Sequence, residues 1–131
     1  MSVGILLITH PGIGSSILHS ANRILGSCAL NTKCLEVPSD VSVTRIQSSA
    51  ETMIGNLNQG QGVLLLTDLY GATPNNLARD YIQKDQVAVL AGLNLSMLLR
   101  VFNYPDLPLD ELCSKAVEGG IKGIHKCNPD A

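Results

Sequence analysis

The sequence predicts an α/β fold, a doubly wound three-layer sandwich around a mostly parallel sheet of strand order 2-1-3-4. Two strongly apolar runs, at residues 4–8 and 63–66, fit strands that are buried on both faces. Segments with helical periodicity alternate with the strands, which indicates parallel strands joined by right-handed crossovers. If the two most apolar strands are central, the strand order reverses between them, and ligands bind at such a switch point.

Length and composition favour a single domain over residues 1–131. The chain is 45% hydrophobic and 15% charged, which excludes a disordered protein. A formal net charge of -2 and 3% aromatic residues give no basis for binding nucleic acid. No apolar run reaches the roughly 18 residues of a membrane span, and the N-terminus lacks a secretory signal. The four cysteines show no metal-ligand spacing, so we expect a cytoplasmic protein without a metal ion or cofactor.

The first half of the chain predicts two strand–helix pairs. The first apolar run ends at Thr9, and Ser15 or Ser16 can cap the helix that follows. Gly26 is the expected end of that helix, and Asp40 or Ser42 can cap the next one. The second strand is more polar, which favours a position at the sheet edge. The expected elements are strands at 4–9 and 30–37 and helices that end near residues 25 and 58.

The second half continues the alternation. Thr73 can cap a helix in which Pro74 takes the first position. Glycines at 119, 120 and 123 surround a weakly apolar segment at 121–125, which leaves open a short fifth antiparallel strand. The expected elements are strands at 63–67 and 87–91 and helices at 74–82, 96–102 and 109–117.

His10 and Asp68 follow the two central strands, so we expect them at the two lips of the switch-point crevice. A carboxylate beside an imidazole fixes the ring tautomer because the ring N–H points at the acid. The other ring nitrogen is then left as an exposed base or nucleophile. A histidine–aspartate contact can also be structural, so the residues around the pair decide between the two interpretations.

The turns beside this pair favour phosphate as the ligand. The turn Gly71-Ala72-Thr73 leads into a helix start, where backbone amides and the Thr73 hydroxyl can bind phosphoryl oxygens. Gly12 and Gly14 can add amides from the other side. A histidine nucleophile, an orienting acid and anion-binding amides together predict phosphoryl transfer through a phosphohistidine.

Three segments of the chain match a known family. They are the strand end Thr9-His10, the turn 68–74 of sequence DLYGATP with the asparagines that follow it, and the segment 92–99 of sequence GLNLSMLL. With these motifs the chain resembles the mannose-type enzyme IIA domain of the bacterial phosphoenolpyruvate-dependent sugar phosphotransferase system. The resemblance covers nearly all of the chain.

The resemblance implies that His10 accepts a phosphoryl group from the histidine phosphocarrier protein and passes it to a IIB component for sugar uptake. It implies that Asp68 holds His10, and that Thr73, where the family usually has serine, steadies the phosphate with nearby amides. It also implies a homodimer in which the terminal strand crosses to the partner. The resemblance further implies that the protein associates with the membrane only indirectly, through a permease complex.

Other interpretations remain beside this one. A regulatory module, in which phosphorylation of His10 controls partner binding without sugar transport, fits the same residues. A scaffold with an inert His10 is a further alternative. A response-regulator receiver is disfavoured because it needs acidic residues where Thr9 and His10 end the first strand. His19 and His125 are expected to be packing or surface residues.

Overall fold

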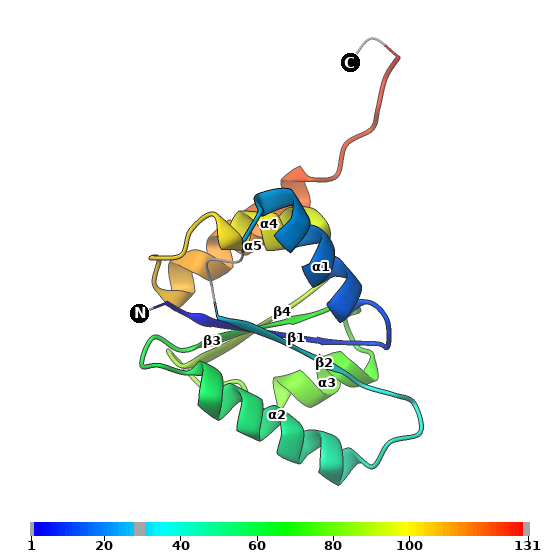
Figure 1. Cartoon of the computed structure of the whole chain (residues 1–131), viewed down its shortest axis with the longest axis vertical. Coiled ribbons are helices and arrows are strands. Elements are labelled where there is room, and N and C mark those ends of the chain that lie inside the picture. Colours follow the sequence, from blue (N-terminus) through cyan, green and yellow to red (C-terminus); the bar gives the residue numbers. More distant parts are fainter. Residues whose placement is uncertain (1, 28–30, 130–131) are drawn as a thin grey trace.

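The computed structural model describes residues 2–27 and 31–129. Its centre is a four-stranded parallel sheet in the order β2-β1-β3-β4, which confirms the predicted order. Figure 1 shows this sheet between two layers of helices. The strands are β1 (Gly4–Thr9), β2 (Thr32–Glu36), β3 (Val63–Thr67) and β4 (Val87–Ala91). The helices are α1 (Gly14–Leu25), α2 (Val43–Leu57), α3 (Thr73–Arg79), α4 (Leu95–Phe102) and α5 (Leu109–Lys122).

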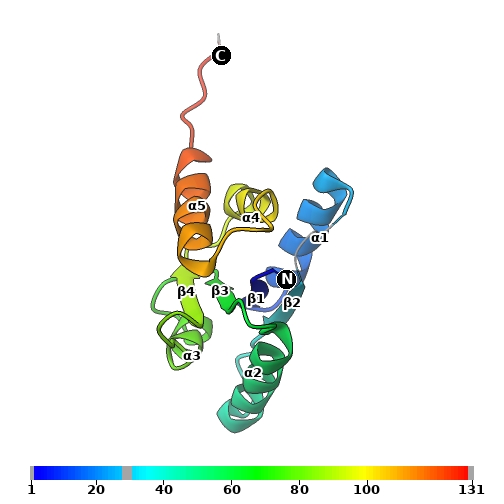
Figure 2. The same cartoon turned by 90° about the vertical axis from the view of Figure 1, so that its left-hand side faces the viewer.

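Two hydrophobic cores lie on the two faces of the sheet. β1 and β3 are buried along their whole length, and their side chains alternate between the faces. Ile5 and Leu64 pack with residues of α1, α4 and α5, whereas Leu6 and Leu65 pack with residues of α2 and α3. Figures 1 and 2 show these two groups of helices on opposite sides of the sheet. Burial on both faces explains why these two strands contain almost no polar residues.

The register of the sheet brings three strand ends to one edge. Ile8 of β1 pairs with Thr67 of β3, and Thr9 of β1 pairs with Glu36 of β2. Because the strands run in parallel, the carboxyl ends of all three strands lie at the same end of the sheet. His10 and Asp68 therefore emerge next to each other, as the sequence predicts.

The structure confirms Gly26 as the C-cap of α1, whereas the N-caps of α1 and α3 differ from the predicted ones. α1 begins before Ser15 and Ser16, so neither serine is its N-cap. Ala72 is the N-cap of α3, and Thr73 is already the first helical residue. Ser42 is the N-cap of α2, but its side chain makes no capping hydrogen bond. The predicted start of the second strand, residue 30, lies outside the described residues.

The predicted short fifth strand near residues 121–125 is wrong. α5 continues through Ile121 and ends at Lys122, and residues 123–129 form no strand. The glycines that suggested a break are instead contact points between helices. A Cβ at Gly119 would collide with the side chain of Arg100 on α4, and a Cβ at Gly120 would lie 3.1 Å from Met97. Their small size permits close packing of α4 and α5.

The helices are short compared with a membrane span. The longest of those in the described residues, α2, has 15 residues, whereas a span takes about 20. None of the described helices combines the length and the hydropathy that crossing a membrane requires.

Candidate active site

His10 and Asp68 form the centre of the site, at the carboxyl ends of β1 and β3. The His10 Nδ1 atom lies 2.7 Å from Oδ2 of Asp68, and the His10 backbone N–H donates to the same oxygen at 3.1 Å. The Asp68 side chain is 8% exposed and that of His10 is 42% exposed. Asp68 therefore holds both the backbone and the ring of His10, while the ring stays open to a reaction partner.

The charge state of Asp68 determines which ring nitrogen is free. Burial raises the pKa of the Asp68 carboxyl, but hydrogen bonds from the His10 ring and backbone outweigh burial and bring the pKa below its ordinary value. Asp68 is therefore a carboxylate near neutral pH, and a carboxylate only accepts hydrogen bonds. Nδ1 must then carry the shared proton, which leaves the lone pair of the neutral ring on Nε2. The arrangement gives His10 a nucleophilic Nε2 at the surface.

Thr9 fixes the start of the loop that carries His10. Its side chain is fully buried, its hydroxyl donates to the His10 carbonyl at 2.9 Å, and its Oγ1 accepts from the Gly14 N–H at 2.9 Å. A Cβ at Gly14 would lie only 2.9 Å from that Oγ1. Gly12 has φ +85°, a conformation that glycine adopts without strain. The glycines are thus required by the shape of the loop.

Glu36 closes the same loop from the neighbouring strand. Its Oε2 accepts hydrogen bonds from the Ser15 N–H at 3.0 Å and the Ser15 hydroxyl at 2.7 Å. Hydrogen bonds from the backbone N–H groups of Ser15 and Gly12, and then from the Ser15 hydroxyl, lower the pKa of the Glu36 carboxyl. Sequence reasoning missed Glu36. The available signal was its position at the end of the strand next to β1, which brings it to the same edge.

Two asparagine side chains, Asn75 from a buried position and Asn76 from an exposed one, hold the turn after Asp68. Asn75 is 2% exposed, and its Oδ1 accepts from the Gly71 N–H at 3.0 Å while its Nδ2 donates to Thr67 Oγ1 at 3.0 Å. Asn76 Nδ2 donates to the Gly71 carbonyl at 3.1 Å. Gly71 itself has φ +82°, which favours glycine at this point of the turn. These contacts fix the path from Asp68 to the start of α3.

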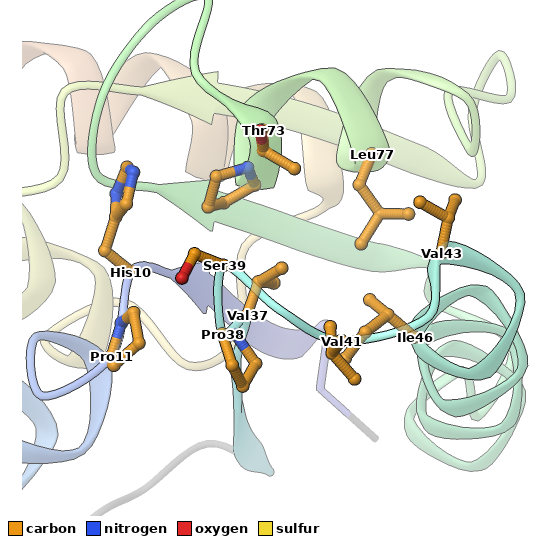
Figure 3. A pocket seen from close by; sticks show the side chains of 11 residues that line it. His10, Pro11, Val37, Pro38, Ser39, Val41, Val43, Ile46, Thr73 and Leu77 are labelled. Carbon is orange, nitrogen blue, oxygen red and sulfur yellow. The ribbon is translucent and has the colours of Figure 1, made fainter.

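A pocket of about 450 Å³ opens beside His10. Figure 3 shows His10 and Thr73 on its rim, one after β1 and the other at the start of α3. The rest of the lining is mostly apolar, and His10 is its only titratable member among the described residues. The lining consists of His10, Pro11, Val37, Pro38, Ser39, Val41, Val43, Ile46, Thr73, Pro74 and Leu77.

The structure brings together the residues predicted to be catalytic: His10 contacts Asp68, and Thr73 lines the same pocket as His10. The loops with the glycines predicted to bind phosphate flank this centre, but their role toward phosphate stays a prediction. His19 and His125 are exposed and belong to neither loop. Within residues 2–27 and 31–129, no group of three or more histidine, cysteine or acidic residues could hold a metal ion.

Comparison with known sequences identifies relatives of the chain. Residues 4–116 match the family model EIIA-man, described as PTS system fructose IIA component. The chain is 31% identical over 128 residues to the PTS system mannose-specific EIIAB component of Escherichia coli (strain K12). That alignment covers 95% of the chain but 39% of the relative's length. The PTS system fructose-specific EIIA component of Bacillus subtilis (strain 168) is 25% identical over 130 residues, with coverage of 96% of the chain and 87% of that protein.

Solved structures agree with the sequence comparison. The mannose/sorbose specific IIA subunit of the phosphotransferase system from Enterococcus faecalis superposes with a TM-score of 0.85 at 25% identity, over 98% of the chain and 96% of that subunit. A phosphotransferase system component EIIA from Streptococcus agalactiae has the same fold, with a TM-score of 0.81 at 24% identity, over 96% and 97% of the two chains. The chain therefore belongs to the EIIA-man family, the fructose- and mannose-type IIA components of the phosphotransferase system.

Proposed function

We propose that this chain is a cytoplasmic phosphoryl carrier of the sugar phosphotransferase system, a single IIA domain over residues 1–131. His10 accepts a phosphoryl group from the histidine phosphocarrier protein and passes it to a IIB component for sugar uptake. One observation carries this proposal: Asp68 binds Nδ1 of His10 at 2.7 Å, which leaves Nε2 as the nucleophile on an exposed ring.

In the forward step, the Nε2 lone pair of His10 attacks the phosphorus atom of the donor's phosphohistidine. A new N–P bond forms while the donor's N–P bond breaks, and the electron pair of the broken bond returns to the donor's imidazole. The phosphorylated ring of His10 keeps its Nδ1 proton and carries a positive charge. Asp68 stabilises that charge through its existing hydrogen bond.

In the second step, a nucleophile of the IIB component attacks the same phosphorus atom. The bond from Nε2 to phosphorus breaks, and its electron pair returns to the ring as the neutral Nδ1–H tautomer. Neither step requires His10 to gain or lose the Nδ1 proton. Catalysis then consists mainly of positioning and charge stabilisation, which suits phosphoryl transfer.

The phosphoryl oxygens need hydrogen-bond donors at the site. Thr73 is exposed and lines the same pocket as His10, so its hydroxyl is the first candidate. The amides of Gly71 and Ala72 are further candidates, although the Gly71 N–H donates to Asn75 in this structure. The amides of Gly12 and Gly14 are candidates on the other side, although the Gly14 N–H donates to Thr9 in this structure, so a phosphoryl group there would have to compete with that contact.

Both protein partners must cover His10 during transfer. Three large apolar side chains next to the reacting pair support such docking, because each is partly or largely exposed: Ile13 at 42%, Leu69 at 59% and Tyr70 at 77%. Exposed apolar groups around a site indicate a protein contact surface. We assign the alternating docking of the phosphocarrier and the IIB component to this surface.

A homodimer is part of the proposal. In the described part of the chain, β4 is an edge strand of the sheet, next to β3. Val117, Ile121 and Ile124 line a shallow pocket with Ala91 of β4, and these three side chains are 40%, 65% and 78% exposed. A second copy of the chain would cover this apolar edge. Sedimentation velocity tests it: a monomer at micromolar concentration would contradict the homodimer, and Ile121→Lys should weaken a dimer that does form.

The function is tested by phosphorylation with phosphoenolpyruvate, enzyme I and the cognate histidine phosphocarrier, measured by intact mass. We expect the wild type to gain one acid-labile phosphoryl group and His10→Ala to gain none. His19→Gln and His125→Gln are matched controls, because both remove an exposed histidine outside the site. A wild type that stays unmodified beside an active donor pair, or a phosphoryl group that persists in His10→Ala, would overturn the proposal.

A further inference from the structure

The Glu36 carboxylate and the loop that carries His10 are joined across two strands. Glu36 is the last residue of β2 and pairs in register with Thr9 of β1. Its Oε2 receives the Ser15 N–H at 3.0 Å and the Ser15 hydroxyl at 2.7 Å. The Gly12 backbone N–H also helps to lower the pKa of this carboxyl. All of these donors lie within five residues of His10 along the chain.

α1 has no anionic group of its own at its start. Its N-cap residue, Ile13, provides no capping side chain, and its first turn contains no acidic residue. The first amides of a helix lack intrahelical partners, and the helix end carries a partial positive charge. Thr9 Oγ1 satisfies the Gly14 amide, and Glu36 satisfies that of Ser15. The capping groups of α1 therefore come from two neighbouring strands.

We propose that Glu36 is a positioning residue for phosphoryl transfer: it fixes the His10 loop and occupies the amides at the start of α1, so that a phosphoryl group on His10 faces the Thr73 side. The inference rests on the proposed function. Without Glu36, the Ser15 amide and hydroxyl lose their anionic acceptor, and the amide is free to bind the phosphoryl group or to move. Either change alters the direction in which the His10 ring presents Nε2.

The lowered pKa of Glu36 agrees with this role, because it keeps the carboxyl ionised near neutral pH. The negative charge of Glu36 also disfavours a phosphoryl group on one side of His10. A carboxylate on the α1 side repels the phosphoryl oxygens, whereas Thr73 on the opposite lip offers a hydroxyl donor. Sequence position alone does not suggest this division of the site into a closed side and an open side.

The test compares Glu36→Gln, Glu36→Ala and Ser15→Ala in the transfer reaction from the phosphocarrier. Glu111→Gln is the matched control, because Glu111 lies in the first turn of α5, which starts beside residues 60–62 at the other end of the sheet. We expect the two Glu36 variants to lose roughly ten- to hundredfold in maximal transfer rate, with the KM for the phosphocarrier nearly unchanged. Ser15→Ala keeps its backbone amide and should lose less. Glu111→Gln should transfer at the wild-type rate.

A second measurement separates positioning from general stability. Amide hydrogen exchange of the unphosphorylated protein should accelerate at Ser15 in Glu36→Ala and stay unchanged there in Glu111→Gln. Transfer at the wild-type rate in both Glu36 variants would overturn the positioning role, even though wild-type phosphorylation stands. A rate loss in Glu36→Gln that Glu111→Gln shares would also overturn it. A wild type that is not phosphorylated overturns the proposed function first, and this inference with it.

Discussion

Asp68 binds His10 twice through one oxygen atom: Oδ2 accepts from the backbone N–H at 3.1 Å and from Nδ1 at 2.7 Å. Within the described residues, the other carboxylate oxygen, Oδ1, is buried and has no hydrogen-bond partner. Both of these hydrogen bonds to the Asp68 side chain come from His10. This favours the ring state in which Nδ1 is protonated, before and after phosphorylation.

Asp68→Asn should slow phosphoryl transfer by roughly 10²–10⁴-fold, because an amide can present its NH₂ group to Nδ1 and stabilise the wrong tautomer. The substitution keeps the size of the side chain, so the fold should remain. Single-turnover transfer from the phosphorylated carrier provides the rate, and circular dichroism checks the fold. A near-normal rate in a folded variant would remove Asp68 from the mechanism.

The lowered pKa of Asp68 predicts a pH-dependent stability. A carboxyl with a lower pKa in the folded than in the unfolded chain stabilises the fold above its unfolded pKa, here about 3.8, and this contribution disappears as the pH falls through the folded value. The difference in unfolding free energy between wild type and Asp68→Asn should therefore be constant above about pH 5 and shrink at lower pH. Urea titrations from pH 7 to pH 3 measure it. A difference that does not change over this range would contradict the assignment.

Thr9→Val should lower the free energy of unfolding by about 1–3 kcal/mol, because the N–H of Gly14 loses its acceptor in a buried place. Valine has nearly the same shape, so the effect isolates the hydroxyl. Chemical denaturation measures the change. Wild-type stability of Thr9→Val would show that the Gly14 amide has another acceptor.

Asn75→Ala should destabilise the protein by about 1–3 kcal/mol and slow transfer, since Asn75 joins Thr67 to Gly71 from a buried position. Asn76→Ala is the control, because Asn76 is exposed and makes one contact to the same turn. Equal effects of the two substitutions on stability would argue against a special role of Asn75.

Gly119→Ala tests the close packing of α5 against α4. In an exposed helix this change would stabilise by about 1 kcal/mol, but here the methyl group meets the side chain of Arg100. We expect a loss of about 1–3 kcal/mol in unfolding free energy. An increase in stability would mean that α4 and α5 do not pack closely at Gly119.

The buried strands were predictable because their pattern is local. β1 and β3 have the predicted bounds, because a strand buried on both faces must be almost entirely apolar. The proximity of His10 and Asp68 was also predictable, because the predicted strand order makes β1 and β3 neighbours and each residue directly follows one of these strands.

The helix ends were harder to predict because their partners are distant in sequence. Serine is a preferred N-cap residue, but at the start of α1 the acceptors come from Thr9 and Glu36 and not from Ser15. Gly119 and Gly120 suggest a break in a helix, but they lie inside α5 because side chains of α4 occupy the space that a Cβ would need. Propensity describes a residue's local preference, whereas in both places a contact from another element decided the structure.

The most direct test of the central claim identifies the phosphorylated atom. Nuclear magnetic resonance of the ¹⁵N-labelled, phosphorylated protein, with phosphorus–nitrogen coupling, distinguishes the two nitrogens of the His10 ring. We expect phosphorus on Nε2 and a proton on Nδ1 that remains hydrogen-bonded to Asp68. Phosphorus on Nδ1, or on another residue, would contradict the account, because the Asp68 contact would then have to break for transfer to occur.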